Sequence, residues 1–371
     1  MDATLLTSPD FWNASEPYAA SPLPDLPPLP ELAGHVLFQT SGTTAAPKWV
    51  ALSKQALLIS ASAVNDHLRV TPDSRWGLAL PLHHVGGFGV AARAYQAGCQ
   101  LVKSDARWQP TAFRDWLARE QVSHTSLVPT QVHDLVLAGL LAPASLIAVV
   151  VGGGHLDPQT GQAARDLGWP ILASYGMTEA GSQIATQGLA TLTFPYQAAP
   201  IPLLPLWAAE VRAGGLLAIS GAALFSGYLS HGIFTARESE WFLTSDQVAL
   251  QNHAITPLGR GDTQVKILGE LVDPTAIERE LESLSQGLLV AGTYAVVALP
   301  DERSGHILIP VFESFVEAEV IEAVLSRYEI SAMGFRRLKP PLTVSSLPRS
   351  PLGKLRRAEL THIVGQQSKT P

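Results

Sequence analysis

Residues His35–Lys48 have the sequence HVLFQTSGTTAAPK, which gives the first indication of the fold of this chain. Its first part, His35–Gln39, is a short apolar run typical of a buried strand. The second part, Thr40–Lys48, consists of small and hydroxyl-bearing residues that favour a loop. A helical pattern follows from Ser53 to His67. The order strand, loop, helix predicts one unit of an α/β fold.

The same alternation continues along the chain. The next expected strands are Trp76–Leu80, Gln100–Val102, Thr125–Val128 and Leu146–Val151. A loop rich in Pro, His and Gly follows the first of these strands, and Thr111–Glu120 is an expected helix. This pattern predicts a large layered α/β body with mixed and parallel sheets. From Leu216 onward, short apolar runs with glycine turns predict a small β-rich subdomain. After Gly259, a small α+β domain is expected from strands at Gln264–Leu268 and Thr293–Ala298 and helices at Pro274–Leu284 and Val316–Tyr328.

Composition excludes several classes of protein. The chain has 371 residues and a net charge of −7, so it has no field that would gather nucleic acid. Cys99 is the single cysteine, which excludes an intrachain disulfide and fits a reducing compartment. The N-terminus lacks the pattern of a secretory signal, and no apolar run is long enough to span a membrane. We expect a soluble cytoplasmic protein without a nucleic-acid partner.

The loop Thr40–Lys48 has the chemistry of a phosphate-binding segment. It combines the hydroxyls of Thr40, Ser41, Thr43 and Thr44 with Gly42 and Lys48. Backbone N–H groups and hydroxyls can surround phosphate oxygens while the lysine supplies charge. A solvated turn is the alternative that composition leaves open, and the GxxxxGK[ST] pattern of a P-loop is absent.

Six motifs follow one another in a distinctive order. They are TSGTTAAPK from Thr40, PLHH from Pro81, YGMTE from Tyr175, TSD from Thr244, GRGD from Gly259 and PLGK from Pro351. This succession, from Gly34 to about Arg357, resembles the adenylate-forming superfamily of acyl-CoA synthetases, adenylation domains and luciferases. Within it, the stretches Leu80–Gly89, Ser123–Asp134 and Val151–Pro158 look most like the o-succinylbenzoate-CoA ligases of menaquinone biosynthesis.

The resemblance implies a two-step reaction. A carboxylate attacks the α-phosphorus of ATP and expels pyrophosphate, and the thiol of CoA then attacks the acyl-adenylate. Positioned donors, Mg²⁺ and lysine would stabilise the anionic charge of both steps. Two alternatives remain: an adenylating enzyme that loads a carrier protein, and a catalytically silent nucleotide-binding homologue that acts as a scaffold.

The resemblance also implies the phosphate-binding residues. Thr40, Ser41, Gly42, Thr43, Thr44 and Lys48 would hold the β- and γ-phosphates. Ala45 departs from the glycine usual at its position, which matters if that position needs a positive φ. Ala46 and Pro47 are expected to lead rigidly into the helix.

The YGMTE motif implies further nucleotide contacts. Tyr175 would lie against adenine, Thr178 would contact the α-phosphate, and Glu179 would bind Mg²⁺, which prefers carboxylate oxygen. The alternative is a helix start capped by Thr178. Gly153, Ser174 and Gly176 complete the predicted cofactor-binding set in this region.

The later motifs imply a ribose site and a mobile lysine. Asp246 would accept both ribose hydroxyls, although Ser245 replaces the usual glycine before it, and Arg260 would also contact the ribose. Asp262 matches the hinge of the family. Lys354 would reach the α-phosphate and carboxylate during adenylation, with an ordinary basic tail as the alternative.

The acyl pocket is less defined by the sequence. His84 matches a family position beside the substrate carboxylate, whereas His83 occupies a usually apolar position. The glycines Gly152–Gly154 would let a flat ring approach the backbone. The second carboxylate of o-succinylbenzoate has no assigned partner; Ser174, His155 and the backbone near Gly181 and Ser182 are candidates.

These observations predict a domain plan. Residues 1–259 are expected to form the ATP- and acyl-binding domain and residues 260–371 a mobile C-terminal lid. Relative to the family, the part before Thr40 is short, so an N-terminal subdomain is expected to be missing. The surface it would cover is expected to be hidden by an extended arm, rich in prolines between Pro17 and Pro30, by substitution or by a homodimer partner.

Overall fold

The computed structural model describes residues 3–21, 29–40, 48–104, 107–261, 264–268, 270–301, 303–350 and 353–367. The chain divides into two compact units. The first comprises Met1–Glu210, Ala218–Leu243 and Leu250–Thr256, and the second comprises Val211–Leu217, Thr244–Ala249 and Pro257–Pro371. Among the described helices, none is long and apolar enough to cross a bilayer.

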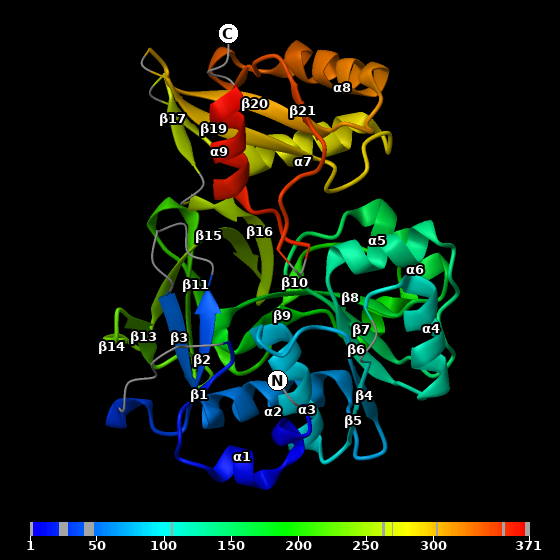
Figure 1. Cartoon of the computed structure of the whole chain (residues 1–371), viewed down its shortest axis with the longest axis vertical. Coiled ribbons are helices and arrows are strands. Elements are labelled where there is room, and N and C mark those ends of the chain that lie inside the picture. The colour runs from blue at the N-terminus through cyan, green and yellow to red at the C-terminus, as the bar shows by residue number, and fades with distance from the viewer. Residues whose placement is uncertain are drawn as a thin grey trace. The chain divides into compact units, whose positions relative to one another are not determined.

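A six-stranded sheet forms the centre of the first unit (Figure 1), in the order β5-β4-β6-β7-β8-β9. Strands β4 to β8 pair in parallel, and β9 runs antiparallel to β8. The strands are β4 (Arg75–Leu78), β5 (Gln100–Lys103), β6 (His124–Leu127), β7 (Ala148–Val151), β8 (Ile171–Met177) and β9 (Ser182–Thr186). All side chains of β6 and β7 are buried, as expected for a parallel sheet covered on both faces.

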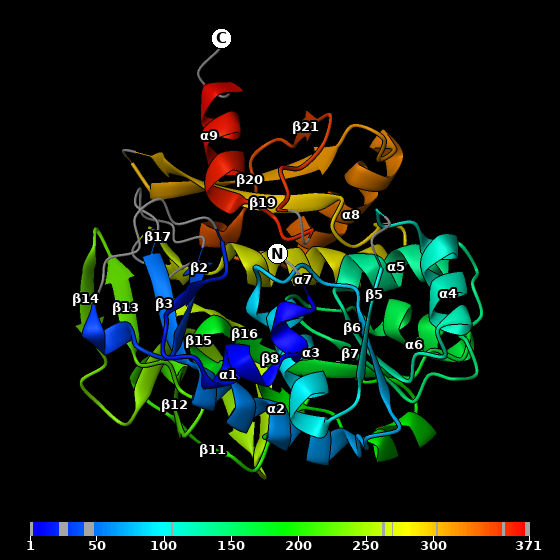
Figure 2. The ribbon, with the colours of Figure 1, turned by 60° about the horizontal axis from the view of Figure 1, so that its bottom comes forward.

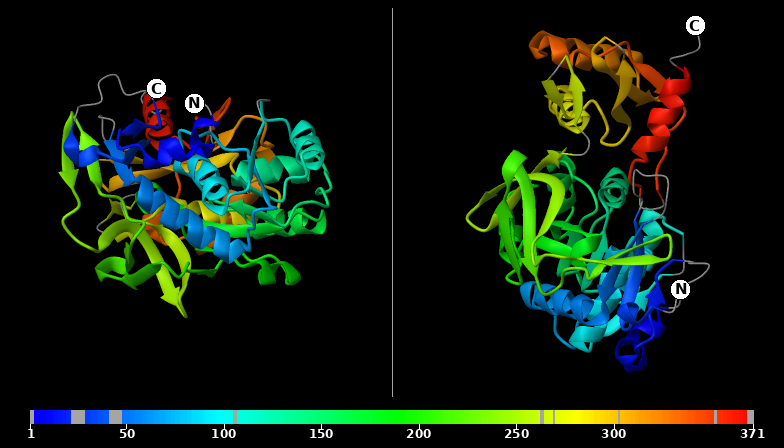
Figure 3. Two further views of the ribbon diagram at one scale, coloured as in Figure 1. Left: turned by 90° about the horizontal axis from the view of Figure 1, so that it is seen from below. Right: turned by 90° about the vertical axis from the view of Figure 1, so that its left-hand side faces the viewer.

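Helices cover this sheet in two groups. The helices α2 (Lys54–Leu68) and α3 (Val85–Ala97) pack against each other, and α3 contacts β4, β5 and β6 (Figure 3, left). The helices α4 (Pro110–Arg119), α5 (Pro129–Leu137) and α6 (Pro158–Asp166) lie side by side (Figure 1). The sequence supplies the caps: the Ser53 hydroxyl accepts a hydrogen bond from the N–H of Ala56, and Asp157 caps α6 in the same way.

A second sheet of the first unit has the order β1-β2-β3-β13-β14. Its strands are β1 (Tyr18–Ala19), β2 (His35–Thr40), β3 (Lys48–Ser53), β13 (Gly227–Ser230) and β14 (Ile233–Ala236). Phe38, opposite Val50, faces Phe88 of α3. The other face carries Trp49 and Leu229, which pack with Leu32 of the N-terminal segment. Both faces of the central strands are therefore buried.

The prediction that the loop leads directly into a helix is wrong. Lys48 begins β3, which pairs antiparallel with β2 and places Lys48 opposite Thr40. Helix α2 starts only after Ser53. Residues 41–47, which include Ala45, Ala46 and Pro47, lie outside the described residues.

The N-terminal segment packs on the body, and the short strand β1 (Tyr18–Ala19) lies within the extended arm that we expected between Pro17 and Pro30. The segment forms η1 (Leu5–Thr7), α1 (Pro9–Asn13), β1 and η2 (Pro30–Leu32). The Trp12 ring stacks on Tyr95 of α3 at 5.3 Å between centroids, and the Lys54 ammonium donates to the carbonyl of Ala14 at 2.8 Å. These contacts cover part of α2 and α3. Residues 22–28, with most of the prolines, are outside the described part of the chain.

A third sheet has the order β10-β16-β15-β12-β11, and the division between the two units passes through its strands. These are β10 (Ile201–Pro202), β11 (Trp207–Val211), β12 (Leu216–Gly221), β15 (Phe242–Gln251) and β16 (Ala254–Arg260). Three short 3-10 helices lie before and within this region: η3 (Thr178–Ala180) between β8 and β9, η4 (Leu189–Thr193) between β9 and β10, and η5 (Ala213–Gly215) between β11 and β12. This sheet is the predicted β-rich part.

The C-terminal part is α+β (Figure 2). Its elements are β17 (Val265–Ile267), β18 (Glu270–Val272), α7 (Pro274–Ser285), β19 (Tyr294–Asp301), β20 (Gly305–Glu313), α8 (Ala318–Ser331), η7 (Gly334–Arg336), β21 (Leu342–Val344) and α9 (Arg357–Gln367). Alternate residues of β19 and β20 face α7 and α8 on one side and α9 on the other. The predicted fold class, an α/β body with a β-rich part and an α+β C-terminal part, is confirmed.

Candidate functional site

The sequence motifs of the first unit converge at one edge of the six-stranded sheet. Because strands β4 to β8 are parallel, the segments that follow them leave the same edge, where ligands of α/β proteins bind. These segments hold PLHH after β4, VPT after β6, GGGH after β7 and, at the end of β8, YGMTE. The three stretches on which the ligase resemblance depends therefore meet in space.

The PLHH loop passes directly into α3. His84 is the residue before the first helical residue, and its carbonyl accepts from the N–H of Phe88 at 2.9 Å. A Cβ on Gly87 would overlap with the carbonyl oxygen of Pro81, so the helix can approach the loop only with glycine there. The glycine-containing stretch from Val85, which we expected to belong to the loop, forms the first turns of α3.

His84 is held as a neutral imidazole. Burial, and next to it the neighbouring His83, lowers the pKa of His84 to about 4. Its Nε2 is buried and has no hydrogen-bond partner among the described residues. A buried ring nitrogen that lacks a hydrogen-bond partner in the protein can bind a polar ligand atom.

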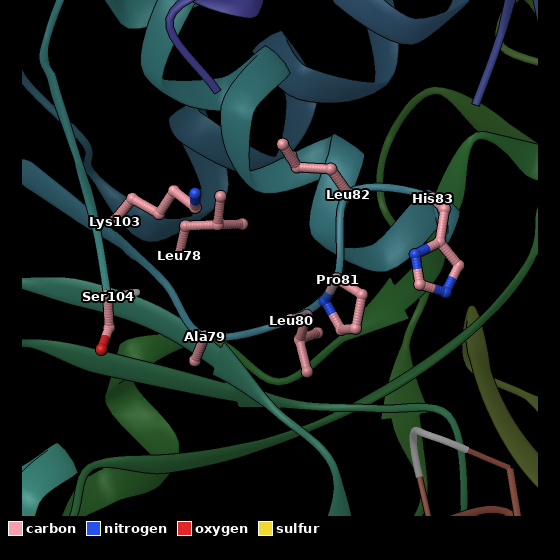
Figure 4. Close-up of a pocket in the computed structure, with 8 residues that line it drawn as sticks. All are labelled: Leu78, Ala79, Leu80, Pro81, Leu82, His83, Lys103 and Ser104. Carbon is pink, nitrogen blue, oxygen red and sulfur yellow. The ribbon is translucent and has the colours of Figure 1, made fainter. Parts of the chain in front are cut away.

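A pocket of about 240 Å³ borders the PLHH loop (Figure 4). It lies at the carboxyl ends of β4 and β5. Its lining is apolar apart from three polar side chains, and consists of Leu78, Ala79, Leu80, Pro81, Leu82, His83, Lys103 and Ser104. His83 is exposed and lines this pocket, whereas the Nε2 of His84 is buried.

The YGMTE segment forms the end of β8 and the turn η3. The register of β8 against β9 shifts between Tyr175 and Gly176. Thr178 and Glu179 follow in η3, and Gly181 ends that turn with a φ of 63°. The alternative of a helix capped by Thr178 is not what the structure has: no side chain caps this turn, which is three residues long.

The glycines after β7 lie next to this segment. The Ser174 hydroxyl donates to the carbonyl of Val151 at 3.0 Å, and a Cβ on Gly152 would lie 2.8 Å from that hydroxyl oxygen. Gly153 has a φ of 80° and is exposed, as is His155. Ser174 and Gly153 thus lie at neighbouring strand ends, as their assignment to one site requires.

Three side chains meet between this turn and the second sheet. The Tyr228 hydroxyl of β13 donates to Oε1 of Glu179 at 3.1 Å. The Nζ of Lys48 lies 3.2 Å from the centroid of the Tyr228 ring. The structure therefore brings the predicted phosphate-binding lysine and the predicted metal ligand together around Tyr228. Thr40 is opposite Lys48 on β2, and Ser41, Gly42, Thr43 and Thr44 lie outside the described residues.

Arg93 of α3 is a buried cation that the sequence analysis missed. Its side chain is 2% exposed, and burial lowers its pKa to about 9, so it stays charged at neutral pH. The guanidinium donates to the hydroxyls of Ser126 at 3.3 Å and Ser182 at 3.4 Å, and it lies over the Trp76 ring. Within the described part of the chain, no carboxylate pairs with it. A guanidinium buried in this way can bind an anion.

In the second unit, Asp246 and Arg260 come together on adjacent strands. The Nε of Arg260 is 3.7 Å from Oδ1 of Asp246, and its Nη2 donates to the Ser245 hydroxyl at 2.7 Å. The Asp246 side chain is 20% exposed and its N–H donates to the Thr244 hydroxyl. These are the two residues that the resemblance assigns to the ribose. The predicted hinge Asp262 lies outside the described residues.

Lys354 lies in a tight turn of the second unit. The N–H of Ser350 donates to the carbonyl of Lys354 at 2.8 Å, and Gly353 has a φ of 73°. The Arg349 guanidinium donates to the carbonyl of Gly353 at 2.6 Å. Several nearby basic side chains are paired, for example Arg357 with Glu278 at 2.5 Å. Several nearby basic side chains thus form ion pairs, while the Lys354 side chain is exposed.

Comparison with known proteins decides the family. Residues 5–229, more than half of the chain, match the family described as AMP-binding enzyme. The chain belongs to the AMP-binding enzyme family.

Among relatives of this AMP-binding enzyme, 2-succinylbenzoate--CoA ligase of Escherichia coli (strain K12) is 29% identical over 74% of this chain and 57% of its own length. The probable 2-succinylbenzoate--CoA ligase of Mycobacterium tuberculosis (strain CDC 1551 / Oshkosh) is 30% identical over 86% of this chain and 82% of its own length. The chain therefore spans little more than half of the E. coli relative.

A solved structure has the same fold. It is a variant of E. coli MenE with bound OSB-AMS, which is 25% identical to this AMP-binding enzyme. The alignment covers 90% of this chain and 69% of that chain, with a TM-score of 0.74.

The donor set of this AMP-binding enzyme fits Mg²⁺ bound on a nucleotide. In the described part of the chain, there is no group of three or more His, Cys, Asp or Glu side chains that could hold a metal ion by themselves. Mg²⁺ at phosphate sites uses one or two carboxylates and completes its shell with phosphate and water oxygens. Glu179 supplies such a carboxylate, and one hydrogen bond from Tyr228 leaves it further lone pairs.

Two residues near the predicted site residues, Arg93 and Tyr228, were not predicted from the sequence, for different reasons. Arg93 had a signal: it is the one charged residue of Val85–Ala97, an otherwise apolar and small-residue segment. Tyr228 had none, because its contacts with Lys48 and Glu179 arise from strand pairing between segments far apart in the sequence.

Proposed function

We propose that this AMP-binding enzyme is an ATP-dependent acid–CoA ligase whose acid is 2-succinylbenzoate (o-succinylbenzoate), in menaquinone biosynthesis. The names of its relatives and the meeting of the motif loops at one sheet edge support this reaction. The carboxylate attacks the α-phosphorus of ATP, the P–O bond to pyrophosphate breaks, and acyl-adenylate forms. The CoA thiol then attacks the acyl carbon, loses its proton and expels AMP.

The buried guanidinium of Arg93 is the observation that carries the choice of acid. The substrate has two carboxylates, and the one that does not react must leave water without losing its charge. A cation that is already buried, and that no described carboxylate neutralises, suits this task. Ser126 and Ser182 orient the guanidinium and leave it further N–H donors for the anion.

The nucleotide roles are part of the proposal. The β- and γ-phosphates are held by Thr40, Ser41, Gly42, Thr43, Thr44 and Lys48, and Thr178 contacts the α-phosphate. The adenine and acyl side is lined by Gly153, Ser174, Tyr175 and Gly176. The ribose is held by Asp246 and Arg260. When bound at Glu179, Mg²⁺ would neutralise phosphate charge. His84, neutral through burial, lies beside the reacting carboxylate.

Lys354 gives the reaction its conformational step. Its ammonium stabilises the charge that develops on the α-phosphate and carboxylate during adenylation. It must then leave, because the CoA thiol approaches the same carbonyl. We propose that residues 260–371 form a mobile lid that turns about Asp262, following the domain plan of residues 1–259 and 260–371.

The proposal also covers the cellular location and the oligomeric state of the enzyme. We propose a cytoplasmic enzyme that forms a homodimer. The single cysteine, Cys99, supports a reducing compartment. Sedimentation of the purified protein tests the proposed homodimer, and a monodisperse monomer would contradict it.

Competition between two acids tests the proposed function. The enzyme is assayed with 2-succinylbenzoate and with an analogue that keeps the ring and reacting chain but lacks the second carboxylate. We expect kcat/KM for the diacid to exceed that for the monoacid by about 100-fold or more, because the analogue leaves Arg93 buried and unpaired. Arg93→Met should abolish this preference and leave ATP affinity unchanged.

The remaining outcomes separate the alternatives. Adenylate formation without any CoA thioester would favour loading of a carrier protein. ATP binding without pyrophosphate exchange for any acid of a broad panel would favour a catalytically silent homologue. Equal use of both acids by the wild type would contradict the role of Arg93.

A further inference from the structure

Tyr228 contacts two charged groups with two different parts of its side chain. Strand β13 pairs antiparallel with β3 and places Tyr228 opposite Val50. Lys48 is two residues before Val50 and therefore lies on the same face of the sheet, at the diagonal position. This register brings the Lys48 ammonium over the ring, 3.2 Å from its centroid, which is a cation–π contact.

The hydroxyl end of Tyr228 faces the turn η3. It donates to Oε1 of Glu179 at 3.1 Å. The same stretch of chain also holds the backbone of Glu179, because the N–H of Phe225 donates to its carbonyl at 2.8 Å. Glu179 is therefore fixed at its main chain and at its carboxylate by residues just before and on β13. The ring of Tyr228 packs on Phe225, 4.6 Å between centroids, which limits its freedom to turn.

We propose that Tyr228 is a positioning residue that preassembles the triphosphate-binding lysine and the magnesium-binding carboxylate; this rests on the proposed function. The ring places the Lys48 ammonium, and the hydroxyl sets the direction of the free lone pairs of Glu179. Partners that orient a metal ligand commonly contribute about 10- to 100-fold to metal affinity. Tyr228 itself touches neither nucleotide nor acid in this role.

The two contacts can be separated by substitution. Tyr228→Phe keeps the ring under Lys48 and removes the hydrogen bond to Glu179. Tyr228→Leu removes both. Tyr196→Phe is the matched control, since the buried Tyr196 hydroxyl has no hydrogen-bond partner among the described residues.

The experiment measures ATP binding by calorimetry in the absence of acid and CoA, with and without Mg²⁺, together with the melting temperature of each variant. We expect Tyr228→Phe to bind metal-free ATP within about 2-fold of the wild type and to need roughly 10-fold more Mg²⁺ for half-maximal enhancement of ATP binding. Tyr228→Leu should in addition weaken metal-free ATP binding by roughly 3-fold or more. Tyr196→Phe should match the wild type.

Other results overturn the proposal in recognisable ways. Wild-type Mg²⁺ dependence in Tyr228→Phe, or equal loss of both affinities in the two Tyr228 variants, would show that Tyr228 is structural only. If the wild type binds Mg²⁺ and ATP but forms no thioester, the proposed function is contradicted. The role of Tyr228 is then still decided by the ATP and Mg²⁺ binding of its variants. A wild type that does not bind ATP would contradict both.

Discussion

The carbonyl oxygen of Ser182 occupies the space in which a side chain on Gly176 would begin. A Cβ on Gly176 would overlap with that oxygen and lie 2.6 Å from the carbonyl carbon. This close approach follows from the shifted register between β8 and β9, and Ser182 itself has a φ of 114°, which is unusual for a residue with a side chain. The contact folds Thr178 and Glu179 back between the two strands and brings the Ser182 hydroxyl to Arg93.

Gly176→Ala should therefore separate β8 from β9. Because the obstacle is backbone, it cannot move aside like a flexible side chain. We expect the melting temperature to fall by several degrees and adenylate formation to fall by at least about 100-fold, measured by pyrophosphate exchange. Gly188→Ala is the control, since its Cβ would meet only the His67 ring at ordinary contact distance, 3.7 Å. Equal behaviour of the two variants would contradict this account.

Two neighbouring glycines of α3 should respond differently to alanine. A Cβ on Gly87 would overlap with the carbonyl oxygen of Pro81 and lie 2.6 Å from that of Leu80, whereas a Cβ on Gly86 would lie 3.5 Å from the side chain of Leu80. Gly87→Ala should push the helix from the PLHH loop and lower both stability and acid affinity. Gly86→Ala should be neutral or slightly stabilising, because alanine favours helix. Thermal melts and the KM for the acid check this, and a tolerant Gly87 would refute it.

The buried His84 should make the protein sensitive to acid. Its pKa is about 4 in the folded protein, whereas an exposed histidine in the unfolded chain has a pKa of about 6.5. Between these values the unfolded chain binds more protons, so stability is full above about pH 6.5 and declines as the pH falls toward 4. His84→Gln should lose less melting temperature than the wild type between pH 7 and pH 5. His83 and His124, whose pKa values burial also lowers, are present in both proteins. An unchanged pH dependence would show that His84 is not the group.

Lys354 should matter for one half-reaction. Lys354→Ala should reduce acyl-adenylate formation by about 100-fold or more, because a cation is removed from the developing charge. Thioester formation from supplied acyl-adenylate should keep most of its rate. Arg356→Ala, which removes a nearby exposed cation paired with Glu359 at 3.3 Å, is the control for a general charge effect. Equal loss of both half-reactions would argue against the role.

Local patterns were sufficient to predict the parallel body of the fold. Apolar runs marked β4 to β7, and the capping Ser53 marked the start of α2 within one residue. They failed at β3 (Lys48–Ser53) because Ser53 both ends this short strand and caps α2, so that no turn residue separates the strand from the helix. They failed at α3 because Gly86, Gly87 and Gly89 weaken helix propensity, and the need for Gly87 comes from loop carbonyls that only the folded chain brings near.

The sequence likewise predicted some residues of the candidate site and not others. Motif order identified Glu179, Asp246, Arg260 and Lys354 as candidates, because these residues lie in short segments with recognisable neighbours. Arg93 and Tyr228 could not be found in that way. The sequence shows Arg93 as the one charged residue of Val85–Ala97, but motif order gives it no role. The burial of Arg93 and the contacts of Tyr228 arise between segments far apart in the sequence, and the three-dimensional arrangement shows them.

Acid-dependent pyrophosphate exchange, followed by detection of the CoA thioester, tests whether this enzyme activates 2-succinylbenzoate and transfers it to CoA. With 2-succinylbenzoate, Mg²⁺ and labelled pyrophosphate, we expect exchange into ATP that depends on the acid, and 2-succinylbenzoyl-CoA once CoA is added. Absence of exchange with 2-succinylbenzoate while ATP still binds, or exchange with the monocarboxylic analogue alone, would contradict the assignment.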